Sequence, residues 1–330
     1  MGRFRKLSIL FFCCAACSVL HSQAAAPETQ PVELQLQVST PFRFAACGDS
    51  RFHDPTDTEA ANPSARQALV RAIAQAHPAF ISFGGDIVYN GYDVNDWKVW
   101  DSETARWREN KIPVYPALGN HDLHGDEKVA LANYFQRFPD LKNSRYYAVR
   151  AGNTLVLVLD SSLDETSGPQ GQWLTRKLDN IPSDVEFVFI VLHHPPYTSS
   201  SDAKKFGGGH SARPQEQELA KVLEARQQTM RARMVVFSGH VHNYERHQHE
   251  GVTYFVTGGA GAHAYPIERA ADDPFQSKEV NYHYLLAEVN RGNLKITMYR
   301  LNLANGAEVW TQSDSVAISV PAARIGAQGQ

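Results

Sequence analysis

The sequence predicts an α/β fold in which two mixed β-sheets pack together and are flanked by helices. Short apolar runs alternate with segments of helical period in the earlier part of the chain, which is typical of α/β domains. Strand-like runs dominate the later part. No Pro-, Gly- or Ser-rich linker follows residue 41, so we expect one domain over residues 42–320.

The predicted strands are apolar runs bounded by glycine, proline or charged residues. They cover residues 42–47, 79–83, 113–118, 186–192, 233–237, 253–257, 283–289 and 294–299, and a hairpin around Gly152 joins 146–150 to 154–160. The predicted helices keep apolar residues on one face. They cover residues 64–77, 97–109, 128–138 and 170–178, and Pro214 opens a further helix.

The first 26 residues predict an export signal. A basic start precedes an apolar run over residues 7–20 and a small-residue stretch that ends at Ala26. This layout is typical of a secretory signal peptide, so we expect a secreted or periplasmic protein. The run is shorter than the roughly 20 residues of a membrane span, and we expect no stable span in the mature protein. A retained anchor and lipidation at Cys17 are the alternatives.

Composition and charge are those of an ordinary globular protein, with 43% hydrophobic residues, 20% charged residues and a formal net charge of −3. Because positive charge is not in excess, we expect no nucleic-acid partner. After the signal peptide the only cysteine is Cys47, which we expect to be a buried small residue without a disulfide partner. Residues 27–41 are an N-terminal extension too short for another domain, and residues 321–330 are predicted to be a disordered tail.

Five predicted strands end close to a side chain that can bind a metal ion. These side chains are Asp49, Asp86, Asn120, His193 and His240, with His242 two residues beyond the last. Ligand sites in α/β sheets gather beyond the carboxyl ends of strands, so we expect these residues to converge. Glycine precedes four of the five and lets the backbone turn sharply. Carboxylate, carboxamide and imidazole ligands without thiolate favour zinc, iron or manganese, and the set is large enough for two ions.

Five sequence blocks carry a family resemblance. They are Gly48-Asp49, Gly85-Asp86-Ile87-Val88-Tyr89, Gly119-Asn120-His121-Asp122, His193-His194-Pro195-Pro196 and Gly239-His240-Val241-His242. In this order they resemble the signature blocks of the calcineurin-like metallophosphoesterases. Tyr89 and the run 239–246 resemble the purple acid phosphatase branch of that superfamily. The resemblance covers about residues 42–300 and implies a four-layer αββα sandwich.

The resemblance implies two metal ions, iron with zinc, manganese or a second iron. Asp86 would bridge them. Asp49, Tyr89 and His242 would complete the first site, and Asn120, His193 and His240 the second. A hydroxide held between the ions would attack the phosphorus of a small phosphate ester.

The resemblance also implies three catalytic residues outside the metal ligands. His121 would protonate the leaving oxygen or stabilise the phosphoryl charge, and Asp122 would orient His121. His210, in a glycine-rich loop, would contact the phosphate. An ordinary surface histidine is the alternative for His210.

Arg51 departs from the family pattern, which has histidine or glycine two residues after the first aspartate. Arginine is a poor metal ligand and a good phosphate partner, so Arg51 either contacts substrate or pairs with a carboxylate. Without that histidine, either Tyr89 or His53 completes the first site. The spacing to Pro195 favours His193 over His194 as the ligand.

These residues favour a secreted phosphomonoesterase of acid phosphatase type. A phosphodiesterase or nucleotide pyrophosphatase on the same core is the second hypothesis, and a catalytically silent metal-binding or adhesion protein is the third. Because a family resemblance identifies a site and not a substrate, the natural ester, the metal pair and the oligomeric state stay open.

Overall fold

The computed structural model describes residues 31–200, 210–304 and 307–321. The predicted signal peptide, Cys17 and residues 322–330 of the predicted tail lie outside this part of the chain. Within the described ranges, no helix has the length and apolar character needed to cross a membrane.

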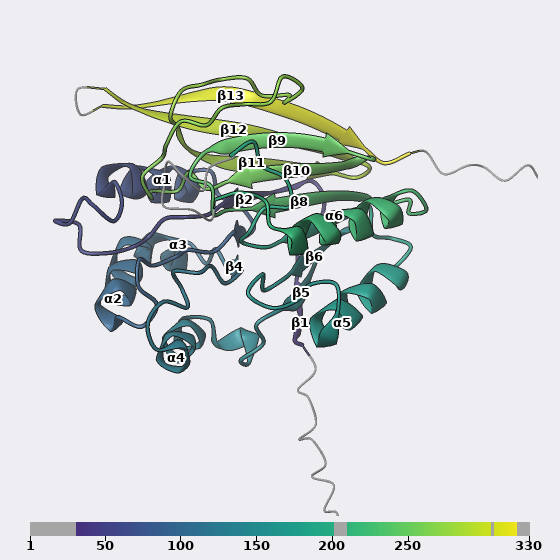
Figure 1. Ribbon diagram of the computed structural model, residues 1–330, viewed down its shortest axis with the longest axis horizontal. Helices are drawn as coiled ribbons and strands as arrows, with labels where there is room; N and C mark the ends of the chain where they lie inside the picture. Colours follow the sequence, from purple (N-terminus) through teal and green to yellow (C-terminus); the bar gives the residue numbers. More distant parts are fainter. Residues whose placement is uncertain (1–30, 201–209, 305–306, 322–330) are drawn as a thin grey trace, which may run out of the picture. The chain divides into compact units, whose positions relative to one another are not determined.

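Two mixed sheets form the centre of the fold (Figure 1). The seven-stranded sheet has the order β1 (Glu33–Leu36), β5 (Tyr147–Ala151), β6 (Thr154–Val158), β7 (Phe187–Val191), β8 (Arg233–Ser238), β10 (Val252–Thr257) and β9 (Tyr244–His249). The six-stranded sheet has the order β13 (Ala307–Ser319), β12 (Asn293–Ala304), β11 (Tyr282–Asn290), β2 (Phe42–Cys47), β3 (Ile81–Phe83) and β4 (Val114–Pro116). Each sheet contains a parallel group, β6-β7-β8-β10 in the first and β2-β3-β4 in the second.

Helices flank both sheets, as the sequence predicts. α1 (Pro63–Gln75) packs against β11 and β12 of the six-stranded sheet. α5 (Gly168–Asp179) and α6 (Pro214–Gln227) lie on one face of the seven-stranded sheet (Figure 1). α2 (Val94–Glu103), α3 (Ala105–Glu109), α4 (Glu127–Arg137) and the 3-10 turn η1 (Pro139–Leu141) belong to the segments that connect β3, β4 and β5.

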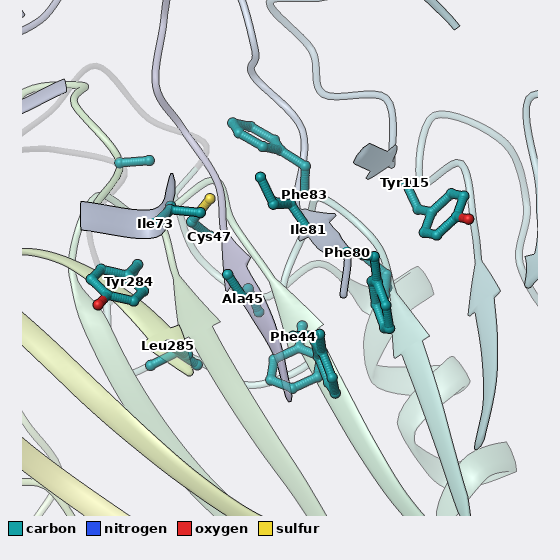
Figure 2. Close-up of a cluster of buried hydrophobic side chains, with 14 of the residues drawn as sticks. Phe44, Ala45, Cys47, Ile73, Phe80, Ile81, Phe83, Tyr115, Tyr284 and Leu285 are labelled. Carbon is teal, nitrogen blue, oxygen red and sulfur yellow. The ribbon is translucent and has the colours of Figure 1, made fainter. Parts of the chain in front are cut away.

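The core lies on both faces of the seven-stranded sheet. In β7, Phe187, Phe189 and Val191 belong to the cluster shared with the six-stranded sheet, whereas Val188 and Ile190 pack toward α5 and α6. This alternation follows from the two-residue period of a strand. Between the sheets, Phe44 meets Phe189 with ring centroids 4.8 Å apart and stacks on Phe80 at 4.6 Å. Figure 2 shows Phe44 and Phe80 in this cluster, which holds the two sheets face to face.

Each predicted strand and helix is present, with ends that differ by a few residues. The helix predicted over residues 97–109 is divided into α2 and α3 at Thr104. The Thr104 hydroxyl donates to the carbonyl of Trp100 at 2.6 Å. Such a side-chain bond competes with the helical hydrogen-bond ladder. Cys47 is buried and unpaired, as predicted.

Three strands, β1, β9 and β13, carry no pattern that predicts them from the sequence. β1 falls within the predicted extension, residues 27–41, and pairs in parallel with β5. All three lie at sheet edges. Because an edge strand buries fewer side chains, its sequence lacks the apolar run that marks a central strand. Residues 33–36 are therefore part of the sheet.

Candidate metal centre

The carboxyl ends of the parallel strands bring the candidate ligands together. Asp49 follows β2, Asp86 follows β3, and Asn120 lies beyond β4. His193 and His240 follow β7 and β8 in the other sheet. A backbone hydrogen bond from Gly239 N to His193 O, 2.9 Å long, joins the last two segments. The site therefore lies where the carboxyl ends of parallel strands from both sheets meet.

Asp86 lies in contact with three other candidate residues. Its carboxylate is fully buried, and its Oδ1 accepts from His121 N at 2.9 Å and lies 3.4 Å from His193 Nε2. Arg51 Nη2 lies 3.4 Å from Oδ2. Burial opposes ionisation, but the charges of His193, His121 and Arg51 outweigh it and lower the pKa of Asp86.

Asp49 is the second buried carboxylate. Both of its oxygens accept from His240 N, at 3.0 and 2.9 Å. Burial, followed by the charge of Asp86, raises the pKa of Asp49. Donor atoms of Asp49, Asp86 and His193 all lie within 4.8 Å of one another. Two carboxylates at such separation repel each other unless a cation neutralises them, so this pair suits a metal ion.

His193, His240 and Asn120 point donor atoms at one another. His193 Nδ1 donates to Gly84 O at 2.8 Å, which leaves Nε2 to face the site. His193 Nε2 and His240 Nδ1 lie 3.0 and 3.1 Å from Asn120 Oδ1, and 3.2 Å from each other. Three donor atoms so arranged suit a second ion.

His194 belongs to the same group of candidate donors as His193 and His240. Its Nδ1, however, lies 2.8 Å from the hydroxyl of Ser161. The arrangement favours His193 as the ligand and His194 as a neighbour whose ring packs 4.3 Å from that of His240.

His242 carries an unsatisfied nitrogen. Its Nδ1 donates to His263 O at 2.9 Å, and its buried Nε2 has no hydrogen-bond partner among the described residues. This Nε2 lies 3.7 Å from Asp49 Oδ1. A buried unpaired polar atom costs about 1–3 kcal/mol, and an ion beside Asp49 would remove that cost. Burial, then the charge of Arg51, lowers the pKa of His242 and keeps the ring neutral, as a ligand must be.

The structure distinguishes the two candidates for the remaining ligand of the first ion. His53 is occupied, with Nδ1 2.6 Å from Asp96 Oδ1 and Nε2 3.2 Å from Asp57 Oδ2. The Tyr89 ring lies beside it, with centroids 5.1 Å apart, and 5.3 Å from the ring of His121. Tyr89 is therefore the better candidate. Together the residues could hold two ions, one beside Asp49 and His242 and one beside Asn120, His193 and His240, with Asp86 within reach of both groups.

The predicted role of Asp122 requires a correction. His121 Nδ1 donates to the carbonyl of Tyr89 at 2.7 Å, so a backbone group and not Asp122 orients the ring. Burial lowers the pKa of His121. The ring also lies 5.9 Å from that of His124.

Asp122 instead holds the backbone of two ligand loops. Its Oδ1 accepts from Ile87 N at 2.9 Å and Val88 N at 3.3 Å, and its Oδ2 accepts from Gly119 N at 2.9 Å. Burial, then the charge of Asp86, raises the pKa of Asp122 to about 8. The carboxylate thus fixes the segment after β3 against the segment after β4.

His210 lies at the site and not on a remote surface. Its ring centroid is 4.9 Å from that of His240, 5.9 Å from His242 and 5.6 Å from Tyr265. Its Nδ1 is buried without a partner in the described part of the chain. Burial, then the charge of His240, lowers the pKa of His210 to about 4.

Of the four glycines before the candidate ligands, Gly85 makes a sharp turn of the predicted kind, with a positive φ of 87°. Three candidate ligands themselves have left-handed backbone, with φ of 61° at Asp49, 52° at Asp86 and 68° at His240. Strain of this kind is typical of functional sites. At Gly119 a Cβ would lie 2.2 Å from Asp86 N, so glycine is needed there for close approach of the chain.

Two residues of the site were not predicted. Tyr265 lies with its ring 5.4 Å from that of His242, and His263 contributes the carbonyl that orients His242. Both come from the loop between β10 and β11. Neither belongs to a sequence block, and a backbone carbonyl leaves no trace in residue type, so no signal in the sequence identified them.

Comparison with known proteins places this site in a family. The model of the calcineurin-like phosphoesterase family matches residues 42–244. The chain belongs to this family. Its curated relatives include phosphoenolpyruvate phosphatase from Allium cepa, 27% identical over 203 residues that cover 57% of this chain and 40% of the relative. Purple acid phosphatase 15 from Arabidopsis thaliana is 28% identical over 204 residues, which cover 56% and 36% of the two chains.

The predicted resemblance to purple acid phosphatases is thus confirmed, although the chain spans less than half the length of these two relatives. Among solved structures, purple acid phosphatase PPD1 from Lupinus luteus is similar, with a TM-score of 0.61, 16% identity, and coverage of 86% of this chain and 54% of that one. GAP50 of Plasmodium has a TM-score of 0.60, 15% identity, and coverage of 86% and 90%. These two structures confirm the predicted fold class.

Proposed function

We propose that this chain is a dinuclear metal-dependent hydrolase of small phosphate esters, acting as a phosphomonoesterase of acid phosphatase type. One observation carries the proposal. The buried Nε2 of His242, unpartnered in the described residues, stands 3.7 Å from a carboxylate of the buried pair Asp49 and Asp86. An arrangement of this kind is costly without a cation and stable with one.

Asp86 would be shared by the two ions, with Asp49, Tyr89 and His242 on one side and Asn120, His193 and His240 on the other. When bound, the ions would acidify a water molecule and neutralise charge on the phosphoryl group. Iron with zinc, manganese or a second iron suits the donor set. A similar Arabidopsis thaliana protein, 23% identical over 242 residues, is named Fe(3+)-Zn(2+) purple acid phosphatase 12, which supports iron and zinc.

Two histidines would act on the substrate directly. His121 is held by its Nδ1 bond to Tyr89 O, which leaves Nε2 for a proton transfer to the leaving oxygen. His210 lies against His240 and would donate to a phosphate oxygen. The predicted signal peptide supports secretion or export to a periplasm.

Two other functions stay as alternatives. A phosphodiesterase or nucleotide pyrophosphatase would use the same metal ligands. A silent binding protein is the second alternative, because GAP50, named as the anchor in an inner membrane complex, has the same fold. The candidate ligand set favours a hydrolase over a catalytically silent binding protein.

The test is to purify the protein without added metal, measure metal content and the visible spectrum, and assay a chromogenic phosphate monoester and diester. We expect two metal ions per chain and preferential monoester hydrolysis. Asp86→Ala should lose bound metal and, with it, activity, whereas the control Asp101→Ala, whose side chain is 44% exposed, should match the wild type.

A purple colour that disappears in Tyr89→Phe would identify iron bound to Tyr89. Two metals and activity without colour would favour zinc or manganese. A protein that binds no metal and stays inactive after metal is added back would contradict the proposal and favour the silent binding protein.

A further inference from the structure

Arg51 directs a guanidinium into the metal centre. Its side chain is 17% exposed, and its Nη2 lies 3.4 Å from Asp86 Oδ2. A charge-assisted hydrogen bond is usually about 2.7–2.9 Å long, so this contact is loose. The Arg51 Nε is buried and has no partner among the described residues. The guanidinium therefore retains donors that Asp86 does not satisfy.

Hydrogen bonds from Arg66 and to Asp86 hold the backbone around Arg51. Arg66 is fully buried and donates two hydrogen bonds to Glu103, Nε to Oε2 at 2.9 Å and Nη2 to Oε1 at 2.7 Å. The same guanidinium donates to Arg51 O and His53 O, both at 3.2 Å. In addition, Arg51 N donates to the backbone carbonyl of Asp86 at 3.0 Å. Arg51 itself has a left-handed φ of 46°.

A segment held on both sides presents its side chain in a defined direction. The direction is toward the candidate ligands, because Nη2 lies 3.4 Å from Asp86 Oδ2. Arg51 thus supplies a fixed positive charge at the centre.

Two ions bound at Asp86 would repel this guanidinium and weaken its hold on the carboxylate. A phosphate oxygen is then the natural partner, because guanidinium and phosphate form strong charge-assisted bonds. A monoester carries up to about two negative charges near neutral pH, whereas a diester carries one. An additional fixed cation favours the dianion more than the monoanion.

We propose that Arg51 binds a terminal phosphate oxygen and thereby selects phosphate monoesters over diesters. This inference rests on the proposed function and names the substrate class of the same site.

The experiment compares metal-reconstituted wild type with Arg51→Met and Arg51→Lys. Three quantities are measured: metal ions per chain, the affinity for inorganic phosphate by calorimetry, and kcat/KM for para-nitrophenyl phosphate and bis(para-nitrophenyl) phosphate. Arg71→Met is the matched control, at an arginine of α1 whose side chain is 43% exposed and pairs with Glu308.

We expect Arg51→Met to keep the metal content, to weaken phosphate binding and monoester kcat/KM by about ten- to a hundredfold, and to change diester kcat/KM by less than about threefold. Arg51→Lys should fall between, because it keeps the charge and loses the planar fork. The control should match the wild type.

Equal losses for both esters, or no loss of phosphate affinity, would overturn the inference. A higher metal content in Arg51→Met than in the wild type would also overturn the inference. It would show that the guanidinium occupies the position of a metal ion and does not bind phosphate. If the metal-containing wild type hydrolyses neither ester, the proposed function fails, and phosphate affinity alone then decides whether Arg51 binds phosphate.

Discussion

Asp122 shows at the residue scale how a carboxylate beside a candidate catalytic histidine can serve the backbone. Three peptide N–H groups, those of Ile87, Val88 and Gly119, donate to it. All three are in the loops that carry Asp86 and Asn120. A buried acceptor with three donors is a structural element, and its removal leaves those donors unpaired.

We therefore predict that Asp122→Asn lowers the free energy of unfolding by about 1–3 kcal/mol and weakens metal retention. The asparagine side chain keeps one oxygen that can accept a hydrogen bond. Its NH₂ group takes the place of the other oxygen and faces a backbone N–H, so at least one hydrogen bond is lost. Urea unfolding and metal analysis check this, with Asp126→Asn as control, because Asn replaces Asp well at the N-cap that Asp126 forms for α4. Unchanged stability together with slower turnover of esters with poor leaving groups would instead mean that Asp122 acts through His121.

At the scale of elements, Glu245 in β9 joins two loops near the site. Its carboxylate accepts from the Thr198 hydroxyl at 2.5 Å and from Ser199 N at 2.6 Å. His247 lies 3.1 Å from the same carboxylate and 3.2 Å from Asp273 in the β10–β11 loop. The segment after β7 and the loop that carries Tyr265 are thus attached to one strand.

We predict that Glu245→Ala loosens both attachments together. Limited proteolysis should become several-fold faster near residues 198–200 and 264–280, and KM for a monoester should rise. Metal content should stay that of the wild type, because no candidate ligand contacts Glu245 in the described residues. The exposed Glu218→Ala on α6 is the control. Cleavage confined to one of the two segments would show that Glu245 does not couple them.

The element scale also shows where sequence patterns lose information. Central strands such as β7 are apolar throughout and were predicted, whereas the edge strands β1, β9 and β13 were not. Division of the helix at Thr104 depends on one hydroxyl hydrogen bond. Apolar periodicity reports burial and does not report such local competition.

At the scale of the whole molecule, stability should depend on pH through a histidine outside the metal centre. His283 in β11 is fully buried, with Nε2 3.2 Å from the hydroxyl of Thr257. Burial lowers the pKa of His283 to about 3. At a pH below 6.5, the ordinary pKa of histidine, His283 takes up a proton in the unfolded chain but not in the folded chain. Stability at this group is therefore lost as pH falls from 6.5 toward 3.

In the wild type the free energy of unfolding should fall as pH is lowered from 6.5 to 5. We predict that His283→Gln reduces the steepness of this fall by up to about 1.4 kcal/mol per pH unit. Urea unfolding at several pH values measures the slope. Ligand histidines contribute equally to both proteins and cancel in the difference. The exposed His77→Asn should leave the slope unchanged, and a His283→Gln slope equal to that of the wild type would show that His283 does not set it.

The sequence by itself determined the family, the fold class and the set of candidate ligands. It could do so because the ligands follow buried strands, and both the apolar run and the polar residue that ends it are local features. Asp49 and Asp86 then converge because β2 and β3 are parallel neighbours, whereas His240 follows β8 in the other sheet and meets them only through the packing of the two sheets. Metal binding by these residues stays a proposal.

Only the tertiary structure decided what each side chain contacts. His53 is held by two carboxylates, Asp122 holds backbone, and Arg51 lies against Asp86. Tyr265 reaches His242 from a loop that no motif marks. These outcomes depend on hydrogen-bond partners far apart in the chain, and residue type alone does not specify which of several possible partners a polar group will meet.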